Sequence, residues 1–263
     1  MLNKIIGQKK IKDFLLNKTL KTFPKSLLLV GEKGCGKHFI SHIISEYFEL
    51  PLVDLTATIN QEVISEIYTA KNPAFYLVDL DKITEKEQNI LLKTVEEPLS
   101  HMYIILVTSK PALVLNTIKG RCFQLMFEPY TEDELVIFAP KLDRQFFNYC
   151  KTPGQALVGS TTNMQDLIAY CNHIAEKFET ASLVNCLNIS DKIAFKDEKD
   201  KYNLDLFIDV LLNCIKTKII EGNSNAMTMY SQIINYNNKR ADIPNVNQKN
   251  LFELLLVEMK TIA

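Results

Sequence analysis

No cysteine cluster occurs in this sequence of 263 residues. A structural zinc site needs closely spaced cysteine or histidine ligands, and the sequence contains no CxxC pair or Cys/His cluster. We therefore predict that zinc is absent, and we interpret the cysteines as small buried side chains. The six cysteines are single and widely spaced: Cys35, Cys122, Cys150, Cys171, Cys186 and Cys214.

An excess of charge of either sign is also missing. The 30 Lys and Arg residues nearly balance the 31 Asp and Glu residues, which leaves a net charge of −1. This balance argues against non-specific binding to nucleic acid or anionic lipid through total charge. A DNA-facing surface would have to act through local geometry instead.

Long hydrophobic runs are absent as well. The apolar run at residues 27–30 is far shorter than the roughly 20 residues that a membrane-spanning helix needs. The N-terminal segment MLNKIIGQKKIKDF has no uninterrupted apolar run of the kind found in signal peptides. We therefore expect a cytoplasmic protein with no membrane partner.

Five short apolar segments, rich in branched and aromatic residues, are present in the first half of the chain. Helical patterns alternate with them, and Thr84 followed by Glu87 forms a capping box at the start of one helix. The apolar runs are nearly continuous, which indicates strands that are covered on both faces. This alternation predicts an α/β fold with a five-stranded parallel sheet and helices on both sides. The predicted strands are residues 26–30, 52–55, 75–79, 103–108 and 123–127, and the predicted helices are residues 8–20, 37–49, 61–70, 84–97 and 112–118.

The strand signals stop near residue 131. A second capping motif begins at Thr131, and Thr152-Pro153-Gly154 predicts a turn that leads into another helix. Long helical patterns follow at residues 204–220 and 250–262. We therefore predict three domains. They are an α/β nucleotide-binding domain at residues 1–130, a small helical domain at residues 131–158 and an all-α domain at residues 159–263.

The sequence GEKGCGK at residues 31–37 is a glycine-rich phosphate loop. It lies directly after a predicted strand and directly before a predicted helix, which is the placement that such a loop requires. Gly31, Gly34 and Gly36 let the backbone wrap closely around phosphate oxygens, and the amides at the helix N-terminus point at the anion. Lys37 is expected to neutralise phosphate charge. These residues predict a nucleotide-binding site.

The residues that should hold Mg²⁺ are incomplete. The position after the lysine normally carries a Ser or Thr hydroxyl that binds Mg²⁺, and here it is His38. We interpret His38 as the loss of a metal ligand rather than as a new catalytic group. Asp79 ends a predicted strand and is the candidate for a degenerate acidic site, because the second acidic position is Val78 or Leu80. A second interpretation is that Asp79 and Asp81 only begin a turn and cap the next helix.

Thr108 ends the fourth predicted strand. Its hydroxyl is a candidate sensor of the γ-phosphate, and the alternative is that it only caps the strand end. Together with the backbone amides and Lys37, these residues predict weak binding of ATP or ADP with weak or absent binding of Mg²⁺.

Five segments carry specific motifs in a fixed order along the chain. Residues 84–98 read TEKEQNILLKTVEEP, and residues 117–122 read TIKGRC. These two segments resemble the Asn-x-Leu-Leu-Lys-x-x-Glu-Glu-Pro and Thr-Ile-x-Ser-Arg-Cys motifs of the clamp-loader AAA+ ATPase family. The resemblance is most marked to the delta-prime subunits of bacterial DNA polymerase III. Further similarities lie at residues 5–8, 104–111 and 152–157, and the resemblance is fainter beyond residue 160.

The resemblance implies a P-loop domain, a helical lid and a helical collar that mediates oligomerisation. It further implies a hetero-pentamer with other clamp-loader subunits, which places a sliding clamp on primer–template DNA in DNA replication. In such assemblies an arginine from one subunit completes the ATP site of its neighbour, and Arg121 matches that arginine. The alternative for Arg121 is a salt bridge within its own subunit.

The chain departs from the family pattern mainly at the ATP site. Besides His38 and the incomplete acidic pair, Gln155 stands where an arginine would contact the γ-phosphate. Gly120 replaces the serine before Arg121, and the zinc-binding cysteines of many relatives are missing. The resemblance therefore predicts a subunit with impaired hydrolysis and a retained arginine finger. An active AAA+ ATPase that acts as a homo-oligomer or nucleotide switch in phage or plasmid DNA metabolism stays open as an alternative, as does a small nucleotide kinase.

Overall fold

The structure is a computed structural model that describes residues 1–178, 180–195, 201–242 and 247–262. The chain forms two compact units, Met1–Glu134 and Leu135–Ala263. The division between them lies near the boundary that the sequence predicts at residue 130. The finer division of the second unit into a lid and a collar stays a prediction.

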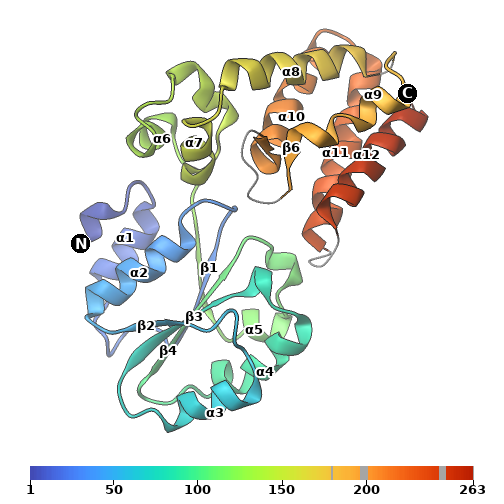
Figure 1. Ribbon diagram of the computed structural model, residues 1–263. Helices are drawn as coiled ribbons and strands as arrows, with labels where there is room; N and C mark the ends of the chain where they lie inside the picture. Colours follow the sequence, from blue (N-terminus) through green and yellow to red (C-terminus); the bar gives the residue numbers. More distant parts are fainter. Residues whose placement is uncertain (179, 196–200, 243–246, 263) are drawn as a thin grey trace. The chain divides into compact units, whose positions relative to one another are not determined.

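The first unit is built on a five-stranded sheet in which every neighbouring pair of strands is parallel. The strand order is β2-β3-β4-β1-β5, so β1 pairs with β4 on one side and with β5 on the other. This topology confirms the predicted α/β fold (Figure 1). The strands are β1 (Ser26–Val30), β2 (Leu52–Asp54), β3 (Ala74–Asp79), β4 (Met102–Thr108) and β5 (Phe123–Met126).

Helices cover both faces of this sheet, because successive side chains of a strand point to opposite faces. Leu27 and Leu29 of β1 face the helices α1 (Lys9–Leu16) and α2 (Lys37–Phe48). Leu28 and Val30 face the opposite layer. Every residue of β1, β3 and β4 is buried, as the continuous apolar runs predict. The opposite layer contains α3 (Gln61–Thr69), α4 (Glu85–Glu96) and α5 (Asn116–Lys119), and the 3₁₀ helices of this unit are η1 (Leu2–Lys4), η2 (Leu80–Lys82) and η3 (Pro111–Leu113).

The capping box predicted at Thr84 is present at the start of α4. The helix predicted at residues 112–118 is wrong in one respect, because the structure divides it into η3 and α5. Gln88 holds the intervening backbone extended. Its side chain donates to the carbonyl of Leu113 at 3.2 Å and accepts from the amide of Leu115 at 3.1 Å.

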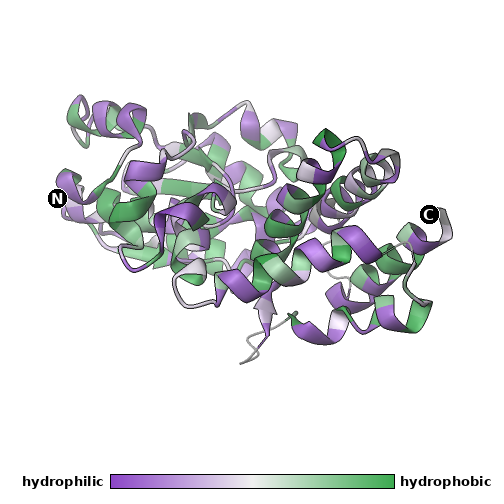
Figure 2. Ribbon diagram, turned by 90° about the horizontal axis from the view of Figure 1, so that it is seen from above, coloured by the Kyte–Doolittle hydropathy of each residue, from purple (hydrophilic) through white to green (hydrophobic). Residues whose placement is uncertain are grey.

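The second unit is mainly helical, and α10 (Leu204–Ile220) lies at its centre. This helix contacts both α8 (Met164–Lys177) and α11 (Ser224–Asp242), and it buries nine of its side chains. The helices of this unit show alternating hydrophilic and hydrophobic bands in Figure 2. The helix confirms the helical pattern at residues 204–220, and its apolar side chains, among them Phe207 and Leu211, belong to the core. The remaining helices are α6 (Glu132–Phe138), η4 (Arg144–Tyr149), α7 (Pro153–Gly159), α9 (Leu183–Leu187), η5 (Ser190–Lys192) and α12 (Gln248–Ile262).

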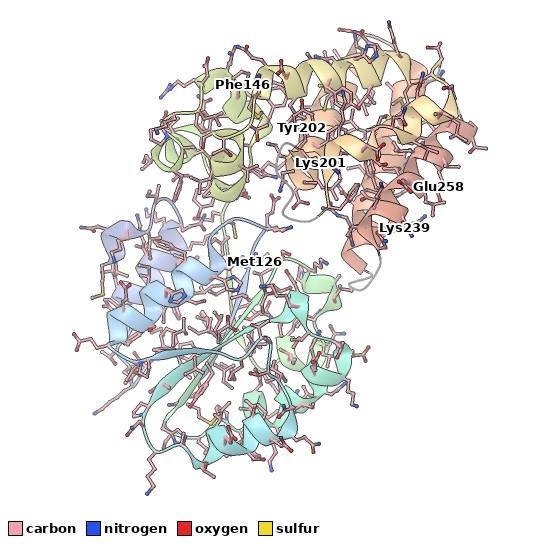
Figure 3. All side chains as sticks on the ribbon, viewed as in Figure 1. Met126, Phe146, Lys201, Tyr202, Lys239 and Glu258 are labelled. Atoms are coloured by element: carbon pink, nitrogen blue, oxygen red, sulfur yellow. The ribbon has the colours of Figure 1, made fainter. Side chains whose placement is uncertain are left out.

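Two short strands correct the prediction that strands stop near residue 131. β6 (Ile193–Ala194) pairs with β7 (Tyr202–Asn203) in parallel. Each has only two residues, too few to produce a periodic pattern in the sequence. Figure 3 labels Tyr202 of β7, as well as Lys239 and Glu258, which form an ion pair of 3.8 Å between α11 and α12. In the part of the chain that the structure describes, no helix combines the length and apolar character that crossing a membrane requires.

Candidate nucleotide-binding site

The structure brings Gly31, Gly34, Gly36 and Lys37 together in one loop between β1 and α2. Gly36 forms the N-cap of α2 with a φ of 98°, a left-handed conformation that favours glycine. A Cβ on Gly31 would lie 2.7 Å from both Cys35 Sγ and Phe127 Cβ, so no larger residue fits there. The loop therefore has the backbone that a phosphate-binding turn needs, with its open end at the N-terminus of a helix.

Lys37 lies inside this loop and is only 7% exposed. Its Nζ donates to the carbonyl oxygens of Gly31 at 2.7 Å and Glu32 at 2.9 Å. Nζ also lies 4.0 Å from Cys35 Sγ, so all three contacts hold the ammonium charge at the loop. The geometry is compatible with the predicted role of Lys37.

Two further residues, Tyr130 and Gln8, stabilise the loop and the chain that follows the carboxyl end of β5. The sequence analysis did not single them out as site residues. The Tyr130 hydroxyl donates to the carbonyl of Cys35 at 2.8 Å, and burial raises the pKa of Tyr130 to about 12. Gln8 donates to the carbonyl of Glu128 at 2.7 Å and accepts from its amide at 2.8 Å. The N-terminal segment is thereby tied to the chain that leaves β5. No local pattern in the sequence predicts these contacts, because Gln8 and Glu128 lie 120 residues apart.

Asp79 is the buried carboxylate at the carboxyl end of β3, and an ammonium group and an imidazole approach it. Its side chain is 8% exposed, and Oδ2 lies 3.2 Å from Lys82 Nζ and 3.6 Å from His38 Nε2. Its Oδ1 accepts from the amide of Asp81 at 3.1 Å. The structure thus joins the two predicted residues His38 and Asp79, and it adds Lys82, which the sequence analysis did not consider.

Thr108 and Asp81 form a second network at the ends of β3 and β4. The Thr108 hydroxyl donates to Asp81 Oδ1 at 2.6 Å and accepts from the amide of Lys110 at 2.9 Å. Asp81 Oδ2 also accepts from the amide and the hydroxyl of Ser109. Burial acts to raise the pKa of Asp81, but the hydrogen bonds from Ser109 and Thr108 outweigh it and hold the pKa below its ordinary value. Thr108 is fully buried, and its hydroxyl already donates its proton to Asp81.

The residues present do not fit Mg²⁺. This ion needs hard oxygen ligands in a near-octahedral arrangement. His38 supplies an imidazole instead of a hydroxyl, and Asp79 already faces Lys82 and His38. The flanking Val78 and Leu80 are buried and apolar. Among the described residues, no group of three or more His, Cys, Asp or Glu side chains is arranged to hold a metal ion.

Arg121 and the phosphate loop of its own chain lie at opposite ends of the strands of the sheet. It precedes the amino end of β5, whereas the loop follows the carboxyl end of the parallel strand β1, whose five residues span roughly 16 Å. Its side chain is 42% exposed, with Nε 2.9 Å from Glu96 Oε1 and Nη1 donating to the carbonyl of Thr117 at 3.0 Å. The salt bridge named as the alternative is therefore present, and the guanidinium stays accessible.

Gln155 belongs to a polar cluster within the second unit that joins α7 to α10. Its amide oxygen accepts from the amide of Lys151 at 2.7 Å, and its amide nitrogen donates to Asp209 Oδ2 at 2.5 Å. Lys151 Nζ lies 2.7 Å from Asp209 Oδ1. Both ends of the Gln155 side chain are thus used within its own unit.

We expect Asp209→Ala to lower the free energy of unfolding of the second unit by about 1–3 kcal/mol, because Gln155 and Lys151 lose a half-buried acceptor. Chemical denaturation followed by circular dichroism measures the change. The matched control is Glu176→Ala, which removes one of the two exposed partners of Lys218 and should leave the free energy of unfolding close to that of the wild type. Equal effects of the two substitutions would contradict the assigned role of Asp209.

Comparisons with known proteins agree with this geometry. Residues 52–131 match a family model described as "DNA polymerase III, delta subunit". The gamma subunit of DNA polymerase III from Buchnera aphidicola subsp. Schizaphis graminum is 23% identical over 78% of this chain and 66% of its own length. The delta' subunit from Haemophilus influenzae is 33% identical over 35% of this chain and 32% of its own length. The chain thus spans about two thirds and one third, respectively, of these relatives.

A solved structure shows the same fold. It is a gamma subunit-related protein of DNA polymerase III from Thermotoga maritima, with a TM-score of 0.54 and 15% identity over 96% of this chain and 99% of that chain. The solved structure shows the same fold, and the family model and the named relatives are similar to this chain in sequence. By these comparisons the chain is similar to the clamp-loader family of AAA+ proteins and, within it, to the gamma and delta' subunits of DNA polymerase III.

Proposed function

We propose that this chain is a delta-prime-like clamp-loader subunit that hydrolyses little ATP itself and supplies Arg121 to ATP held by a neighbouring subunit. The observation that carries the proposal is the state of Asp79. Asp79, the candidate acidic residue for hydrolysis, is paired with Lys82 and lies 3.6 Å from His38, while the phosphate loop keeps its glycines and Lys37.

The partners that follow from this proposal are other clamp-loader subunits in a hetero-pentamer, a sliding clamp and primer–template DNA. The position of Arg121 supports action on a neighbour. It lies a full strand length from the loop of its own chain, and its guanidinium is accessible. A planar guanidinium can donate two parallel hydrogen bonds to phosphate oxygens, so it can both offset charge on the γ-phosphate and report that ATP is present.

An ATPase that acts alone, as a homo-oligomer or a nucleotide switch, is less well supported. Hydrolysis would need an acid to hold the Mg²⁺ shell and a group to orient water. Asp79 faces Lys82 and His38 instead, and Val78 and Leu80 are apolar.

We expect the purified chain to turn over ATP far below the range of about 1–100 s⁻¹ that is typical of kinases. The physical reason is that Asp79 is paired with Lys82 and that the described residues contain no group of three or more His, Cys, Asp or Glu side chains arranged to hold a metal ion. Phosphate release measures the rate, and Lys37→Ala gives the background from contaminating enzymes. A Lys37-dependent turnover within that range would contradict the proposed impairment.

A further inference from the structure

Lys82 is a basic residue at the site to which the sequence analysis assigns no role. The single 3₁₀ turn η2, which follows β3, brings its Nζ back to within 3.2 Å of Asp79 Oδ2, three residues earlier. Asp79 is 8% exposed, so its negative charge needs a close counter-ion. The Lys82 side chain is 64% exposed, so its ammonium group contacts Asp79 and is at the same time accessible to solvent.

Lys82 and His38 also act on the carboxylate of Asp54, at the end of another strand of the sheet. Asp54 lies at the carboxyl end of β2, and the backbone amide of Thr56 donates to its Oδ1 at 2.9 Å. Burial acts to raise the pKa of Asp54, but the Thr56 hydrogen bonds and the charges of His38 and Lys82 lower it below its ordinary value. Lys82 and His38 therefore act on the carboxylates at the ends of both β2 and β3, and His38 lies in the first turn of α2, where the phosphate loop ends.

We propose that this phosphate loop binds nucleoside di- or triphosphate without Mg²⁺, with Lys82 and His38 in place of the metal. The inference rests on the proposed function, in which the site is degenerate but still admits a nucleotide. A metal ion would have to displace the ammonium of Lys82 from Asp79 and accept an imidazole where it prefers oxygen. A lysine is a compact point charge on a flexible stem, so it can reach a phosphate group without fixed coordination geometry.

The experiment is a fluorescence titration of the full chain with N-methylanthraniloyl ADP and ATP, once in excess Mg²⁺ and once in EDTA. We expect the two dissociation constants for each nucleotide to agree within about threefold, since no metal bridges protein and phosphate. Weakening of wild-type binding by about tenfold or more in EDTA would overturn the inference. Absence of binding in both buffers would overturn it as well.

Two variants test which residues replace the metal. Lys82→Ala should weaken binding in EDTA by about tenfold, whereas Lys86→Ala, which removes an exposed lysine one turn further on, should leave it unchanged. In the double variant His38→Ser/Lys82→Ala, a hydroxyl and a free Asp79 are restored, so nucleotide binding should become stronger in Mg²⁺ than in EDTA. Equal binding by wild type and Lys82→Ala would refute the role of Lys82.

These outcomes are separate from a failure of the proposed function. Entry of this chain into a clamp loader and the action of Arg121 on a neighbour do not require nucleotide in its own loop. A loader that assembles and depends on Arg121, while this chain fails to bind the fluorescent nucleotides, would disprove only the metal-free site.

Discussion

Arg121→Ala is expected to lower DNA-stimulated ATP hydrolysis by the reconstituted clamp loader by about 10³-fold or more, the effect known for arginine fingers supplied by a neighbour. Arg121→Lys should not restore the rate, because the ammonium group lacks the planar fork of the guanidinium. The assay compares hydrolysis, complex formation by gel filtration and thermal stability of each variant.

The salt bridge with Glu96 gives this experiment a matched control. Both side chains are more than one third exposed, so the pair should contribute only about 0–1 kcal/mol to stability. Glu96→Gln removes the charge of the partner and leaves Arg121 in place, so hydrolysis should stay near wild type. Wild-type hydrolysis by both Arg121 variants would show that the assignment is wrong. Unfolding of these variants, with Glu96→Gln also unstable, would identify Arg121 as a structural residue.

Removal of residues 135–263 is expected to abolish entry into the clamp loader while the first unit stays folded. Residues 1–134 retain both hydrophobic clusters of the sheet, one on each face. The second unit contains the predicted collar. Circular dichroism and gel filtration with partner subunits measure folding and assembly.

A longer fragment of residues 1–158 provides the comparison. It keeps α6, η4 and α7 but removes α10, against which η4 and α7 pack, so these two elements lose a packing partner. We expect this fragment to be less soluble than residues 1–134. If residues 1–134 still co-elute with partner subunits, the helical second unit is not what mediates assembly.

The sheet was predictable from the sequence because its strands are buried on both faces. A run such as SLLLV has no alternation, and that pattern alone indicates a covered parallel strand. The phosphate loop was predictable for a similar reason, since Gly36 and Lys37 lie at a fixed local spacing between strand and helix.

The hydrogen bonds and ion pairs of the individual candidate residues were harder to predict from the sequence. Gln155 and Asp209 are 54 residues apart, and their hydrogen bond depends on how α7 packs against α10. Arg121 has no acidic residue close in sequence, and it meets Glu96 because the ends of α4 and α5 lie together. Lys82 is the exception, because its spacing of three residues from Asp79 is visible in the sequence and indicates a neighbour across one 3₁₀ turn.

The order of strands in the sheet also affects how the protein folds during synthesis. β1 is the first strand that the ribosome produces, yet its partners are β4 and β5, and Ser26 pairs with Ile104. Pairing over such sequence separations is slow, because the intervening loop must close before any contact forms. The apolar strand that carries the phosphate loop is therefore exposed on the nascent chain until β4 emerges. It is fully paired only when β5 has been added.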